Sequence, residues 1–230
     1  MKIKSHIPNS ITLLNLLSGI IGIIWVLDGN IISGAWFILI SAFLDFVDGF
    51  AARILKVQGE LGKQLDSLAD LVSFGVLPGI ILFAMAKTNS QIEWLPYCTL
   101  ILPLFSALRL AKFNLDTRQT DRFIGVPTPA AALFVSTIPH FAIQWPKIGT
   151  VITSPFFVVA IALSLSILLI SEIPLIALKF KSFAFSKNIF RYVLIVVSLL
   201  LFVWLGLAGI PLIIISYLGL SVTENAMRSE

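Results

Sequence analysis

Long apolar runs separated by short polar turns dominate this chain. They cover residues 10–28, 31–54, 65–86, 95–115, 128–146 and 151–171, and a weaker pair follows near 190–205 and 209–223. A helix that crosses a bilayer needs about 20 mostly apolar residues, because its backbone polar groups must be hydrogen-bonded within the segment. The pattern predicts an all-α integral membrane protein with about eight transmembrane helices.

The composition indicates a single membrane domain. Hydrophobic residues make up 58% of the 230 residues and charged residues 12%, whereas a soluble domain has about 25% charged residues. We expect one domain over residues 1–230, with a core over 7–175 and a C-terminal helical pair over 188–224. Each half of that pair is shorter than an ordinary span, so one tilted helix is the alternative.

Basic residues indicate how the spans are oriented, because short cytoplasmic loops collect Lys and Arg. With the N-terminus inside, fourteen of the sixteen basic residues fall on the cytoplasmic side, and Lys87 and Lys147 fall outside. The sequence therefore predicts a multi-pass protein of the cell membrane with a cytoplasmic N-terminus. It has no soluble basic module, so nucleic acid is not a predicted partner.

Four aspartates, Asp45, Asp48, Asp66 and Asp70, occupy a window of 26 residues where one predicted span ends and the next begins. An Asp at the centre of a spanning helix costs about 2.5–3.5 kcal/mol on insertion. Even near a membrane face, this group must be offset by another interaction. Divalent metal is the natural counter-charge, and solvated carboxylates at the membrane surface are the alternative.

The spacing of the aspartates favours metal. The first two are three residues apart and the last two are four residues apart, so each pair lies on one face of a helix. A short turn containing Gly59 and Gly62 would make the two helices antiparallel, so that the pairs face each other. Mg²⁺ and Mn²⁺ prefer hard oxygen ligands and leave positions open for substrate phosphates.

Small and basic residues beside the first pair indicate phosphate binding. Gly49 and Ala52 continue the helical stripe of Asp45 and Asp48, which leaves bare backbone where a ligand can approach closely. Arg53 follows directly and can supply a fixed cation to phosphate.

Written as a pattern, residues 45–70 read D-x-x-D-G-x-x-A-R-x8-G-x3-D-x3-D. This resembles the signature of the CDP-alcohol phosphatidyltransferase family, with every specified position matched. The resemblance implies a six-helix membrane core, a homodimer, and two divalent ions, Mg²⁺ or Mn²⁺, that bind the pyrophosphate of a CDP-linked lipid. It also implies attack by an alcohol on the phosphorus that bears the lipid, with CMP leaving.

The resemblance assigns roles to individual residues. Asp70 corresponds to the general base that takes the proton from the acceptor hydroxyl, and it is also a metal ligand. The predicted metal ligands are Asp45, Asp48, Asp66 and Asp70. The predicted contacts to CDP and its phosphates are Gly49, Ala52, Arg53, Gly62, Asn9 and Thr12. For Asn9 and Thr12, at the start of the first span, helix capping is the alternative.

Stretches outside the signature bear on the acceptor. Residues 7–15, 67–78, 107–114 and 123–130 resemble the branch of the family that uses serine, the phosphatidylserine synthases. The implied substrates are CDP-diacylglycerol and L-serine, and the implied products are phosphatidylserine and CMP.

Serine carries a carboxylate, and Arg109 is a residue of the right chemical class to bind it. A charge that snorkels to the membrane interface is the alternative for this arginine. The other predicted acceptor-binding residues are Lys112, Asn114 and Arg118. For Lys112 and Arg118, an ordinary cytoplasmic loop charge is an equally good interpretation, and Lys112 stands where the branch motif has Arg.

Two alternative functions remain. Glycerol 3-phosphate or an inositol phosphate could replace serine as the acceptor, although these anions call for a more basic pocket. A membrane cation transporter would be a different class of protein. It predicts acidic residues spread over broken helices near the bilayer midplane, whereas these aspartates gather at one membrane face beside an arginine.

Overall fold

The computed structural model describes residues 3–57, 59–115, 123–176 and 188–228. The α-helices in these ranges are α1 (His6–Leu27), α2 (Gly34–Ile54), α3 (Glu60–Asp70), α4 (Leu77–Asn89), α5 (Ile101–Leu115), α6 (Thr128–Gln144), α7 (Pro146–Ile152), α8 (Pro155–Ile170), α9 (Ile189–Leu205) and α10 (Ile210–Arg228). Two short strands, β1 (Phe123–Ile124) and β2 (Pro174–Leu175), pair in antiparallel orientation. The predicted all-α fold is confirmed, apart from this pair of strands.

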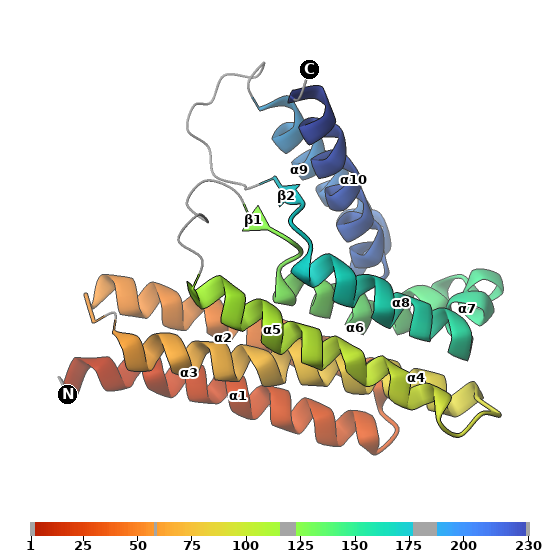
Figure 1. The fold of residues 1–230 in the computed structure, drawn as a ribbon, viewed down its shortest axis with the longest axis horizontal. Coiled ribbons are helices and arrows are strands. Elements are labelled where there is room, and N and C mark those ends of the chain that lie inside the picture. The colour runs from red at the N-terminus through yellow and green to blue at the C-terminus, as the bar shows by residue number, and fades with distance from the viewer. Residues whose placement is uncertain (1–2, 58, 116–122, 177–187, 229–230) are drawn as a thin grey trace.

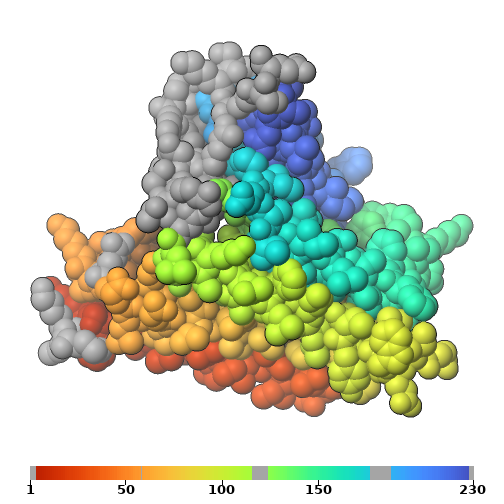
Figure 2. Space-filling model, viewed as in Figure 1, coloured from red at the N-terminus to blue at the C-terminus, as the bar shows by residue number. Residues whose placement is uncertain are grey.

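The helices form an elongated bundle from which one pair of helices projects (Figure 1). Helices α1 to α5 run alongside one another, and α6 and α8 pack against them. Helices α9 and α10 lie side by side and point away from the bundle, and Figure 2 shows the blue surface of α10 rising from it. Helix α10 contacts α6 and β2, so the pair is attached to the bundle at its side.

Helix α1 shows how the bundle is packed. Its buried positions are mostly small or polar: Pro8, Thr12, Asn15, Ser18, Gly19, Gly22 and Val26. Leu13, Leu14 and Leu17 point outward and are 50%, 51% and 48% exposed. In lipid, apolar side chains gain little by turning inward, whereas small residues let helix backbones approach closely. This pattern is that of a multi-pass membrane protein.

The described residues contain five helices that are long and apolar enough to cross a membrane, or six if the bent pair α7 and α8 forms one span. This is fewer than the eight spans predicted. Helix α6, in the predicted span 128–146, has 17 residues and is too short to be among the five. The last two predicted spans fall in one stretch of 39 residues, 189–227, which counts once. That stretch reverses at Gly206, where φ is 56°. It therefore folds as two helices and not as one tilted helix.

A π-helical segment, η3 (Leu71–Val76), joins α3 to α4, so the span predicted over 65–86 runs as one helix from Glu60 to Asn89 with π-helical turns inside it. Such segments are frequent at functional sites. Helix α1 approaches η3 closely, because a Cβ on Gly19 would lie 2.5 Å from Ser73 Oγ. Ser73 is buried and donates a 3.0 Å hydrogen bond to the backbone oxygen of Asn15. This contact holds η3 against α1.

Candidate metal and phosphate site

Three carboxylates converge where α2 and α3 face each other. Asp45 and Asp48 belong to α2 and Asp66 belongs to α3, and one oxygen of each lies within 4.8 Å of the other two. The predicted juxtaposition of the two helices is therefore found for these three residues. Asp70, one turn beyond Asp66, lies outside this group.

These carboxylates are partly withdrawn from water and repel one another. Asp48 is 5% exposed, and Asp45 is close enough to Asp48 and Asp66 for their charges to interact. Like charges gathered at a buried position cost free energy unless a cation neutralises them. Several hard oxygen donors at this spacing suit a divalent cation, so the cluster can bind such an ion.

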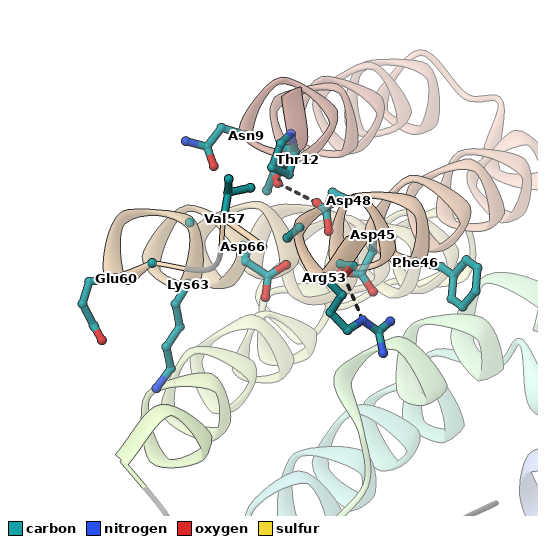
Figure 3. Close-up of a pocket in the computed structure, with 15 residues that line it drawn as sticks. Asn9, Thr12, Asp45, Phe46, Asp48, Arg53, Val57, Glu60, Lys63 and Asp66 are labelled. Atoms are coloured by element: carbon teal, nitrogen blue, oxygen red, sulfur yellow. Dashed lines mark hydrogen bonds between the residues drawn. The ribbon is translucent and has the colours of Figure 1, made fainter. Parts of the chain in front are cut away.

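The cluster lines a cavity of about 720 Å³ bounded by α1, α2 and α3 (Figure 3). The predicted site residues that line it are Asn9, Thr12, Asp45, Asp48, Gly49, Ala52, Arg53, Gly62 and Asp66. A Cβ on Gly49 would meet no atom within 4 Å, so the backbone there is open to the cavity. Arg53 Nε donates a 3.0 Å hydrogen bond to Gly49 O, which uses one of its five N–H groups.

Two more charged residues, Glu60 and Lys63, line the same cavity, although the signature does not point to them. Lys63 Nζ donates a 2.8 Å hydrogen bond to Asn114 O. Asn114, a predicted acceptor-binding residue, donates a 2.8 Å hydrogen bond from Nδ2 to Ser67 Oγ, so it joins α5 to α3. Lys63 precedes Asp66 by three residues, so the two lie on the same face of a helix. This spacing is the signal that could have identified Lys63 as a residue of the cavity.

The turn between α2 and α3 differs from the prediction. Helix α3 begins at Glu60 after the extended Gly59, so Gly62 lies in its first turn and not in the loop. The chain reverses instead near Lys56, whose φ is 52°. Gly62 faces α1, where an added Cβ would lie 3.5 Å from Asn9 Oδ1.

Thr12 orients one of the clustered carboxylates. Its Oγ1 donates a 2.6 Å hydrogen bond to Asp48 Oδ2 (Figure 3). Helix α1 begins at His6 without a side-chain cap, so Asn9 and Thr12 lie inside the helix and the capping alternative is wrong. A fixed hydrogen-bond partner sets the orientation of a metal ligand.

Thr12→Val removes this hydrogen bond and keeps the shape of the side chain. Because partners of this kind change metal affinity by 10–100-fold, we expect the affinity for Mg²⁺ or Mn²⁺ to fall by roughly tenfold in titration calorimetry of the purified protein. Thr88→Val is the matched control, since Thr88 Oγ1 bonds to Ala84 O at the exposed end of α4. An unchanged affinity in Thr12→Val would contradict the role of Thr12.

Asp70 contacts a residue that the sequence analysis missed. Asn15 of α1 is 0% exposed, and its Nδ2 lies 3.4 Å from Asp70 Oδ1. The backbone oxygen of Asn15 accepts hydrogen bonds from Ser41 Oγ at 3.4 Å and from Ser73 Oγ at 3.0 Å. A buried amide is costly in an apolar span, so the presence of Asn15 in the first predicted span is the signal that could have identified it as a functional residue.

The predicted acceptor-binding residues lie in different settings. Arg109 of α5 is 8% exposed and donates a 2.8 Å hydrogen bond from Nε to Val126 O. It lies near enough to Asp70 for their opposite charges to attract, so it is not the snorkelling charge of the alternative interpretation. Lys112 is exposed, and Arg118 lies outside the described residues.

The sequence of this chain is similar to those of known proteins. Residues 5–215 match the profile of the CDP-alcohol phosphatidyltransferase family. A CDP-diacylglycerol–serine O-phosphatidyltransferase of Bacillus subtilis is 39% identical over 133 residues, which cover 56% of this chain and 72% of that protein. One of Mycobacterium leprae is 35% identical over 176 residues, which cover 74% of this chain and 57% of that protein. An archaetidylserine synthase of Methanothermobacter thermautotrophicus is 34% identical over 141 residues, or 59% of each chain. The match thus spans somewhat more than half the length of the last two relatives.

Proposed function

We propose that this chain, which belongs to the CDP-alcohol phosphatidyltransferase family, transfers a phosphatidyl group from CDP-diacylglycerol to the hydroxyl of L-serine. The products are phosphatidylserine and CMP. The observation that carries the proposal is the cluster of Asp45, Asp48 and Asp66 in the wall of a large cavity. Relatives named for transfer to serine support the choice of acceptor.

The aspartates are suited to hold two divalent ions, Mg²⁺ or Mn²⁺. Asp45, Asp48 and Asp66 would be ligands through their clustered oxygens, and Asp70 would complete the set. Bound metal would neutralise charge on the pyrophosphate and on the departing CMP.

The rest of the cavity is suited to the nucleotide and its phosphates. Arg53 and Lys63 supply fixed positive charge at its wall, and Gly49 and Ala52 leave room for a phosphate beside the helix backbone. Asn9 offers an amide to the nucleotide from α1.

Asp70 takes the proton of the serine hydroxyl while the hydroxyl oxygen attacks the phosphorus that carries the diacylglycerol. A new P–O bond to serine forms, and the bond from this phosphorus to the bridging oxygen of the pyrophosphate breaks, so CMP leaves with that electron pair. Asn15 orients the carboxylate of Asp70 through its amide. Arg109 is buried and its charge attracts that of Asp70; it binds the carboxylate of serine through a charge-assisted hydrogen bond.

The alternative acceptors, glycerol 3-phosphate and inositol phosphate, carry a phosphate where serine carries a carboxylate. A phosphate calls for more positive charge than one arginine. Among the described residues, Arg109 is a buried cation close enough to Asp70 for their charges to attract, and Lys112 is exposed. This arrangement supports serine, and membership of an enzyme family argues against the cation transporter.

The setting of the site follows from the pattern of basic residues. We place the aspartates and the N-terminus at the cytoplasmic face of the cell membrane, because short cytoplasmic loops collect Lys and Arg.

Residues 1–230 form one membrane domain, in which 7–175 make the catalytic core and 188–224 the C-terminal pair. Two copies of the chain form a homodimer, as its family resemblance implies.

The acceptor is tested with the purified full chain, CDP-diacylglycerol in detergent micelles, Mg²⁺ or Mn²⁺, and one labelled acceptor at a time. We expect phosphatidylserine from serine, and at least ~100-fold less product from glycerol 3-phosphate or inositol phosphate, because their phosphates are not matched by charge. CMP release with another acceptor but none with serine would reject serine and keep the reaction type.

A further inference from the structure

Arg109 takes its position from the backbone of a neighbouring segment. Its Nε donates a 2.8 Å hydrogen bond to Val126 O, and its Cζ lies 5.3 Å from the centre of the Phe113 ring. An arginine stem is flexible, so a fixed backbone acceptor decides where the other N–H groups of the guanidinium point. The position of Val126 therefore sets the position of Arg109.

Val126 is held in turn by the end of α8 and the residues after it. The N–H of Val126 donates to Leu168 O at 3.1 Å, and the N–H of Gly125 donates to Ile173 O at 3.0 Å. Gly125 has a φ of 73°, and a Cβ there would lie 2.7 Å from Leu169 O, so this close approach requires glycine. Strand β1, directly before Gly125, pairs with β2. Movement of β2 would therefore move the segment that binds Arg109.

Helix α10 binds β2 and the residue that follows it. Tyr217 Oη donates to Ile176 O at 3.1 Å, and Ser221 Oγ accepts from Ile176 N at 3.1 Å. Asn225 Nδ2 donates to Pro174 O at 2.5 Å. The three side chains recur every four residues, so they lie on one face of α10. Figure 1 shows β2 beside this helix, above the bundle.

These hydrogen bonds lie at a buried position. Ser221 is 1% exposed and Ile176 is 4% exposed. A buried N–H that loses its hydrogen-bond partner costs free energy, so β2 cannot slide along α10 without a penalty. A helix that served only as a lipid-facing anchor would not need polar side chains here, because they are expensive in a membrane.

We propose that Tyr217, Ser221 and Asn225 are positioning residues for the acceptor. They hold β2, and β2 acts through β1 and Val126 on Arg109. The inference rests on the proposed function, since it takes Arg109 as the partner of the serine carboxylate. The described residues that line the cavity with the aspartates belong to α1, α2, α3 and the turn before α3, so α10 affects serine and not the nucleotide.

Ser221→Ala tests the proposal in the purified full chain. It removes the acceptor of the Ile176 N–H, and we expect the KM for serine to rise about tenfold, the factor for one lost hydrogen bond. The KM for CDP-diacylglycerol and kcat should change less than about twofold. Ser221→Thr keeps the hydroxyl and should restore the serine KM. Thr223→Ala, on the exposed face of α10 where Thr223 Oγ1 bonds to Gly219 O, should change neither constant.

A double variant shows whether Ser221 acts through Arg109. Ser221→Ala added to Arg109→Lys should raise the serine KM no further, because coupled residues are not additive. Additive effects, or an equal rise of both KM values, would overturn the proposal. If Ser221→Ala fails to fold, Tyr217→Phe removes a single hydroxyl and should raise the serine KM about threefold; an unchanged KM there would also overturn it. Wild-type protein that forms no phosphatidylserine would instead reject the proposed function.

Discussion

Asp70→Asn is expected to lower phosphatidylserine formation by about 10²–10⁴-fold, the usual contribution of a general base. The amide has nearly the shape of the carboxylate and can still meet Asn15, but it cannot take the proton of the serine hydroxyl. Because the three clustered carboxylates are retained and an Asn side chain still offers an oxygen ligand, CDP-diacylglycerol should still bind. The loss should therefore appear in kcat far more than in the KM for CDP-diacylglycerol.

The measurement is the initial rate of labelled phosphatidylserine formation, with calorimetric binding of CDP-diacylglycerol alongside. Asp28→Asn is the matched control, since Asp28 is an exposed carboxylate at the other end of α1 and its loss should leave both quantities unchanged. A rate within tenfold of wild type in Asp70→Asn would remove Asp70 from the role of base. Loss of nucleotide binding together with rate would show that Asp70 acts chiefly as a metal ligand.

Asp66→Asn is expected to abolish transfer at metal concentrations that saturate the wild-type enzyme. If one carboxylate contributes about 3 kcal/mol to metal binding, the affinity falls by about 100-fold.

The same cluster predicts that a chelator stops the wild-type enzyme and that Mg²⁺ or Mn²⁺ restores its activity. Comparison of the two ions at equal concentration shows which one supports the faster rate.

Thermal unfolding gives a second measure of Asp66→Asn that does not depend on turnover. Without metal, loss of one charge relieves repulsion among Asp45, Asp48 and Asp66, so the variant should have a higher Tm than wild type. With metal, the wild-type Tm should rise, because the ion binds the folded state, whereas the variant should respond little. Glu60→Gln is the matched control, as Glu60 lines the same cavity on the same helix outside the cluster. A metal response in Asp66→Asn equal to that of wild type would show that the cluster is not the metal site.

The clustered aspartates could be predicted because their geometry is local. Asp45 and Asp48 lie in one regular helix and Asp66 in the next, so helical spacing and a short connection bring them within 4.8 Å of one another. The surroundings of Asp70 could not be predicted in this way. They depend on a π-helical segment that follows Asp70 directly and on Asn15, which lies 55 positions earlier in the chain.

The sequence by itself determined the helical membrane fold, the family and the carboxylate cluster. Apolar run length, helical period and motif spacing are properties of neighbouring residues, so they can be read without coordinates. Only the tertiary structure decided that the last run folds back as α9 and α10, that Arg109 is held by Val126, and that α10 reaches β2. The contacts of α10 with β2 and Ile176 join residues 41 to 51 positions apart. No local pattern records such pairs, because they form only when helices distant in the chain pack together.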